Sequence, residues 1–197
     1  MNMLSMLKDM VGALTGLAVS LIVLAVSFLR IIPDVHNFSP IIALGIFGAL
    51  HYKNKILSYV IPILSIWFSD LIINNFIYNL SNNIVFLYEG FYWQYLSYIL
   101  IIFLSFNFNK RKIAILNLLF LVLSSSLLFF VITNFGYWLT TDTYDNSVIG
   151  LLNCYIAAIP FYKGTLLSTL FYTPLFIGVY YLLQKKILLL RSNHIVY

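Results

Sequence analysis

The chain has 197 residues, of which 62% are hydrophobic and only 9% are charged, and its mean hydropathy is +0.96. A soluble globular domain is roughly 45–50% apolar and about 25% charged. The composition therefore excludes a soluble enzyme and predicts an integral membrane protein. The net charge of +5 does not indicate a nucleic-acid partner, because the basic residues lie near the ends of apolar runs rather than in one cluster.

Apolar runs divide the chain into six predicted transmembrane helices. We place them at residues 11–32, 41–52, 56–76, 91–108, 112–133 and 165–184. The first run is longer than the apolar part of a signal peptide, and no small-residue cleavage site follows it, so we expect it to be retained. The expected fold is an all-α polytopic bundle in one membrane domain, residues 1–197, with the lipid bilayer as its main partner.

Two apolar stretches are too short to cross a hydrocarbon core of about 30 Å. Residues 41–52 would rise only about 18 Å as a helix. We expect this helix to tilt, to use the Phe38-Ser39-Pro40 loop before it, or to lie among its neighbours, where irregular backbone is protected from lipid. Residues 148–159 precede Pro160, and we expect a separate re-entrant or interfacial helix that ends at this proline.

The six-helix arrangement sorts the basic residues unequally between the two sides of the membrane. Basic residues favour the cytoplasmic side, so both termini are predicted to be cytoplasmic and the protein to be multi-pass. One side holds Lys8, Lys53, Lys55, Lys110, Arg111, Lys112, Lys185, Lys186 and Arg191, and the other holds Arg30 and Lys163. The outer side then contains the segments 30–40, 70–94 and 133–163, where we expect the polar chemistry to be.

Asp70 is predicted near the outer end of the third helix, within a strongly apolar run. A carboxylate at membrane depth normally faces a partner or a cavity. Two interpretations stay open: a contact with a ligand, ion or proton, or a structural pair with Arg30 or a side chain that reaches the interface. In the first case Asp70 matters for uptake more than for folding. We expect it to face the bundle interior, near Arg30 or Asn134.

Polar and aromatic side chains also mark the predicted outer ends of the fourth and fifth helices. Trp93 and Gln94 start the fourth helix, and Asn134 and Trp138 end the fifth. Trp residues at such places are typical of an interfacial belt, whereas the Asn134 amide needs a hydrogen bond to another helix or to a ligand. We expect the loop at 37–40 and the segment 133–138 to meet at the outer end of the bundle.

Few residues suggest catalysis or metal binding. Cys154 is the single cysteine, and on an apolar stretch it is more typical of a small buried side chain than of a nucleophile. The sequence contains no Walker, dinucleotide-binding, zinc-protease or nucleophile-elbow motif and no paired metal ligands. We therefore expect no cofactor, no metal and no enzyme, although Asp70, His36 and Cys154 leave a membrane enzyme as a third alternative.

Small residues follow one face of the first predicted helix. Gly12, Gly16 and Ser20 have the spacing that lets another helix approach closely. The ladder serves either internal packing or the docking of a partner.

Several of these segments resemble a known family when taken together. They are Asn37-Phe38-Ser39-Pro40, then Ser69-Asp70, then Thr133-Asn134-Phe135-Gly136-Tyr137-Trp138, and the Gly150 to Phe161 segment. Their order over residues 30–176 is similar to an uncharacterised family of small bacterial integral membrane proteins assigned to transport. That family looks like the S components of energy-coupling-factor importers in size and six-helix layout. Where it commonly has an acidic residue after the Thr-Leu-Leu stretch, this chain has Ser168 and Thr169.

The resemblance implies a transport component of the bacterial inner membrane. Its substrate would be a small, vitamin-like solute, its partner an energising membrane protein, and its docking surface the Gly12, Gly16 and Ser20 ladder. Candidate binding residues for an outward-facing pocket are Asn37, Phe38, Asp70, Trp93, Gln94, Asn134, Trp138 and Cys154. The alternative is an accessory or assembly subunit of a larger membrane complex, in which the same polar residues contact protein and no solute is bound.

Overall fold

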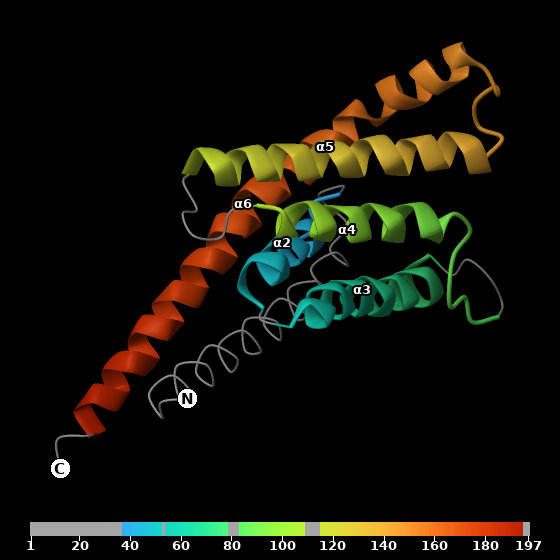
Figure 1. Cartoon of the computed structure of the whole chain (residues 1–197). Helices are drawn as coiled ribbons and strands as arrows, with labels where there is room; N and C mark the ends of the chain where they lie inside the picture. Colours follow the sequence, from blue (N-terminus) through green and yellow to red (C-terminus); the bar gives the residue numbers. More distant parts are fainter. Residues whose placement is uncertain (1–36, 53, 79–82, 109–114, 195–197) are drawn as a thin grey trace.

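The computed structural model describes residues 37–52, 54–78, 83–108 and 115–194, and within these ranges it is helical with no strand. The elements are α2 (Ile41–His51), α3 (Lys55–Ile72) followed by the π-helical turn η2 (Ile73–Ile77), α4 (Phe91–Phe106), α5 (Ile115–Thr140) and α6 (Val148–His194) (Figure 1). The all-α prediction is therefore confirmed for the described part of the chain. The predicted first helix, with Arg30, lies outside the described residues.

Three of these helical segments are long and apolar enough to cross a membrane: Lys55–Ile77, Ile115–Thr140 and Val148–Lys185. The helices Ile41–His51 and Phe91–Phe106 are apolar but shorter. The predicted total of six spans and the orientation of the termini stay predictions. Figure 1 places the residues directly before α4 and the α5–α6 connection at the same end of the bundle.

The short helix α2 lies inside the bundle, against α3, α4, α5 and α6. Every residue from Ile41 to Ala49 is buried, as expected for a helix that is apolar on all sides. Of the three arrangements that its length left open, the structure has the one in which neighbouring helices surround it. Pro40, directly before the helix, is buried as well, whereas Phe38 and Ser39 are partly buried and Asn37 is exposed.

Two clusters of buried side chains hold α2 in place. The first joins α2 to α6 and contains Ala43, Leu44, Phe47, Tyr172, Phe176, Ile177 and Tyr180. The second joins it to α3, α4 and α5 and contains Ile41, Ile42, Ile46, Ile66, Tyr98, Ile101, Leu121 and Val122. The hydroxyl of Ser58 on α3 donates to the carbonyl of Gly48 over 2.8 Å. At the α2–α3 turn, burial raises the pKa of the Tyr52 phenol well above its usual range, so this group stays neutral.

The prediction of a separate helix at 148–159 was wrong. The structure has one continuous helix, α6, from Val148 to His194, with Pro160 and Pro174 inside it. A proline removes one backbone donor and crowds the preceding turn, which usually ends a helix in water. In an apolar surrounding the other backbone groups have no solvent to bond, so the helix continues through the proline. Figure 1 shows α6 crossing the bundle and extending past the ends of the other labelled helices.

The fifth helix also extends further than predicted. It continues to Thr140, so the whole Thr133 to Trp138 motif is helical and does not form a loop at the helix end. Three polar side chains in the last turns of α5 donate to carbonyl oxygens four residues earlier: Thr133 to Phe129, Asn134 to Phe130 and Thr140 to Gly136. These bonds satisfy polar groups within the helix, which lets it continue through a polar motif.

Candidate functional site

The connection between α5 and α6 is a compact loop fixed by hydrogen bonds to one carbonyl group. The Asp145 carbonyl accepts from Nε1 of Trp138 over 3.0 Å and from the Ser147 backbone N–H over 2.7 Å. Ser147 then caps α6, since its Oγ accepts from the N–H of Gly150 over 3.1 Å. A Cβ atom at Gly150 would lie 2.0 Å from the Asp145 oxygen. The loop therefore requires glycine at this position.

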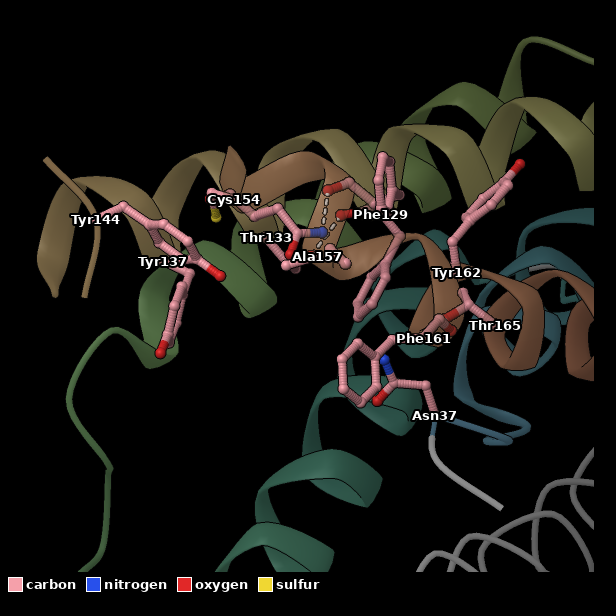
Figure 2. A pocket seen from close by; sticks show the side chains of 13 residues that line it. Asn37, Phe129, Thr133, Tyr137, Tyr144, Cys154, Ala157, Phe161, Tyr162 and Thr165 are labelled. Atoms are coloured by element: carbon pink, nitrogen blue, oxygen red, sulfur yellow. Dashed lines mark hydrogen bonds between the residues drawn. The ribbon is translucent and has the colours of Figure 1, made fainter. Parts of the chain in front are cut away.

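A cavity of about 380 Å³ opens between α5 and α6 beside this loop. Its size is within the range of small-molecule sites, about 300–1,000 Å³. In Figure 2, Tyr137 and Tyr144 lie at one end of the cavity and Asn37, Phe161 and Thr165 at the other. The lining residues are Asn37, Phe129, Phe130, Thr133, Asn134, Tyr137, Tyr144, Cys154, Ala157, Ala158, Phe161, Tyr162 and Thr165.

Asn37 reaches this cavity from the loop before α2. Its φ angle is +60°, a left-handed conformation that asparagine adopts more readily than most residues. Its carbonyl accepts from the N–H of Ser39 over 3.0 Å, which turns the chain toward Pro40. The predicted meeting of the 37–40 loop with the 133–138 segment is thus present at Asn37, since Thr133, Asn134 and Tyr137 line the same cavity.

Three polar side chains that α5 and α6 contribute to the cavity donate hydrogen bonds to backbone carbonyls. Thr133 donates to Phe129 over 2.8 Å, Asn134 to Phe130 over 2.7 Å and Thr165 to Phe161 over 3.3 Å. The Cys154 thiol contacts the Asn134 carbonyl at 3.5 Å. Thr133 and Thr165 therefore offer a bound molecule their oxygen acceptors, and Asn134 offers its side-chain oxygen and one further N–H. The hydroxyls of Tyr137, Tyr144 and Tyr162 in the lining can donate or accept.

Aromatic rings make up most of the remaining wall. Phe130 and Tyr162 have ring centroids 5.0 Å apart, and Tyr137 and Tyr144 are 6.4 Å apart in an edge-to-face arrangement. Among the described residues that line the cavity there is no Lys, Arg, Asp, Glu or His. The part of the chain that the structure describes also holds no group of three or more His, Cys, Asp or Glu residues placed to bind a metal.

Three of the eight predicted binding residues, Asn37, Asn134 and Cys154, line the cavity. Of the other five, Phe38 packs on Tyr172 with ring centroids 5.5 Å apart, and Trp138 bonds to the loop as described above. Asp70 is 7% exposed on α3, so it faces the interior as predicted, but it is not among the lining residues. Its role in uptake stays a prediction.

Trp93 and Gln94, on the first turn of α4, have structural contacts instead. The Trp93 ring lies against Phe135, with centroids 5.7 Å apart, and covers the backbone of Gly136 so closely that a Cβ there would be 2.1 Å from Trp93 Cγ. Gln94 Oε1 accepts a hydrogen bond from the Tyr88 hydroxyl. Trp93 of α4 and Gly136 of the α5 motif thus join the two helices. The docking residues Gly12, Gly16 and Ser20 lie outside the described residues.

The sequence interpretation missed most of the α6 wall. Cys154, Ala158, Phe161 and Thr165 follow one another at the spacing of a single helix face. That periodicity was available in the sequence. A predicted helix end at Pro160 and a predicted helix start at residue 165 divide this face between two elements, so the prediction does not include it.

Comparison with known protein families gives a match. A family model described as "Family of unknown function (DUF6580)" matches residues 13–192. No curated protein matches the chain, and no solved structure does.

Proposed function

The chain belongs to the Family of unknown function (DUF6580), whose match covers both walls of the cavity, and from this premise we propose that it binds a small solute between α5 and α6 for transport across the membrane. The observation that carries the proposal is the cavity of about 380 Å³, in which residues from four separate segments meet. The four segments are the loop before α2, the second half of α5, the α5–α6 loop and the first half of α6.

The distribution of polar groups supports a solute-binding role over an accessory role. Subunit interfaces are built from side chains that pack against a partner protein, whereas small-molecule sites are mostly apolar cavities with a few convergent polar groups. Here Asn37, Thr133 and Asn134 converge on one hollow with aromatic walls. An accessory subunit would not need such a space.

We propose further that the protein works as a substrate-binding component, like the S components, in a bacterial inner membrane with both termini cytoplasmic. The sequence has no nucleotide-binding motif, so a separate membrane partner would supply the energy. What supports the orientation is the unequal distribution of basic residues. Reporter fusions at the two termini test it, and termini on opposite sides would contradict it.

Native mass spectrometry of the purified full-length protein tests whether the cavity is occupied. We expect a small molecule to remain bound to the wild type and to be lost from Ala157→Trp, because Ala157 lines the cavity and is solvent-accessible, so the larger ring fills the hollow. The matched control is Leu127→Trp, which adds a ring at a 51% exposed position on α5 outside the lining. The same spectrum for wild type and Ala157→Trp would contradict the proposal.

A further inference from the structure

We propose that the cavity selects an uncharged, flat molecule that donates hydrogen bonds to the oxygen acceptors of α5. This inference rests on the proposed function and adds to it the chemical class of the solute. It follows from which hydrogen-bonding groups of the cavity are already used, which charges are present, and how the aromatic walls are arranged.

The first step concerns the direction in which Asn134 presents its amide. Its side chain lies 2.7 Å from the Phe130 carbonyl oxygen, and a carbonyl only accepts, so the amide nitrogen must be the atom in that contact. The carbonyl oxygen of the Asn134 side chain takes no part in that contact, and the amide nitrogen keeps one further N–H. The Thr133 hydroxyl likewise donates its hydrogen to the Phe129 carbonyl. One turn of α5 therefore presents two adjacent acceptors.

A ligand must supply the protons for these acceptors. A buried acceptor that loses water without gaining a donor costs about 1–3 kcal/mol, so a molecule with N–H or O–H groups is preferred over an isostere that lacks them. Thr165 adds a further acceptor at the opposite end of the cavity, since its hydroxyl donates to Phe161.

The second step concerns charge. An anion would face these oxygen acceptors and would find no cation among the described lining residues. A cation would find no carboxylate among them, and an unpaired charge at membrane depth is costly. Lys163 on α6 is exposed and is not among the lining residues. A neutral molecule meets neither penalty.

The third step concerns shape. The lining includes six aromatic rings, those of Phe129, Phe130, Tyr137, Tyr144, Phe161 and Tyr162. Aromatic partners prefer offset or edge-to-face contact with a planar ring. In Figure 2 the amide of Asn37 points toward the Phe161 ring, which leaves a polar group beside an aromatic face. A flat ring with a donor on its edge matches both features.

Four small probes separate the chemical classes. Indole is neutral and flat with one N–H, benzofuran has the same shape without the donor, indole-3-acetate is an anion, and tryptamine is a cation. Each probe is added to the full-length Ala157→Cys, Cys154→Ala variant in lipid nanodiscs. The readout is the rate at which methyl methanethiosulfonate modifies the new cysteine, because Ala157 is an accessible lining residue. Asn146→Cys in the Cys154→Ala background is the control for effects away from the cavity, because Asn146 is an exposed loop residue outside the lining.

We expect indole to protect Ala157→Cys at a concentration roughly 3- to 10-fold lower than benzofuran, as one hydrogen bond predicts. Adding Asn134→Leu should abolish this ratio. The matched control is Asn107→Leu, because Asn107 makes the same bond to a carbonyl four residues earlier, at 3.1 Å, on the exposed end of α4. Partitioning of the probes into lipid is common to all variants, so it cancels when their ratios are compared.

The outcomes distinguish this inference from the function on which it rests. Equal protection by indole and benzofuran, or an unchanged ratio in Asn134→Leu, would overturn the donor preference while leaving a solute site in the cavity. Strongest protection by tryptamine or by indole-3-acetate would replace the neutral class with a charged one. If no probe protected the cavity cysteine, both the inference and the proposed binding site would be wrong.

Discussion

Gly136→Ala should be among the most destabilising single substitutions in the described part of the chain. A Cβ at Gly136 would lie 2.1 Å from Cγ of Trp93 and 2.4 Å from its Cδ1, well inside van der Waals contact. The Trp93 ring is held between α4 and α5, so relief requires the helices to separate. Overpacking of this kind costs about 1–3 kcal/mol or more, and we expect the upper end, a fall in Tm of roughly 6–12 °C for a chain of this length.

The control for this prediction is Gly178→Ala on α6, where no atom lies within 4 Å of the added Cβ. Alanine favours a helix over glycine by about 1 kcal/mol, so Gly178→Ala should leave Tm unchanged or raise it. A double-mutant cycle identifies the cause: in a Trp93→Ala background the cost of Gly136→Ala should largely disappear. Equal costs with and without the Trp93 ring would show that the close contact is not responsible.

Gly150→Ala should disrupt the loop that closes one end of the cavity. The added Cβ would lie 2.0 Å from the carbonyl oxygen of Asp145 and 2.9 Å from its carbonyl carbon. Because the obstacle is backbone, no change of rotamer relieves the clash, and the loop must shift. That shift removes the Trp138 to Asp145 hydrogen bond and displaces the neighbouring Tyr144 from the cavity wall. We expect a loss of about 2 kcal/mol in stability together with weaker retention of the bound solute.

Thermal unfolding and native mass spectrometry of the same preparation measure the two effects. Ile149→Ala is the matched control, because it places the same residue one position earlier at a site that is 71% exposed. It should retain the solute as the wild type does. A Gly150→Ala protein with unchanged Tm and unchanged solute would mean that the loop does not depend on the close approach at Asp145.

Several parts of the fold were predictable because composition and periodicity report burial in lipid. The all-helical class follows from the free-energy cost of unpaired backbone groups in lipid, and the buried position of Asp70 follows from the free-energy cost of a carboxylate that faces lipid. The helices α3 and α4 begin within a residue of the predicted positions. The meeting of Asn37 with the α5 motif was also predictable, since both segments carry polar groups that need partners away from lipid.

The errors have a common physical cause. Rules for helix ends derive from proteins in water, where the solvent competes for backbone groups, and they placed a boundary at Pro160 that the structure lacks. They likewise placed the end of α5 before Asn134, although its amide bonds within the helix. The role of Trp93 was not predictable, because its contact with Gly136 joins residues 43 positions apart in the sequence and depends on how α4 packs against α5.

An experimental density map of the wild-type protein in a lipid nanodisc tests the central claim most directly, because it locates whatever occupies the space between α5 and α6. The account predicts compact density inside the cavity, within hydrogen-bond distance of the Asn134 side-chain oxygen and against the Phe161 ring. A lipid acyl chain entering between the two helices, or a closed cavity in which Asn37 and Asn134 bond to each other, would contradict it.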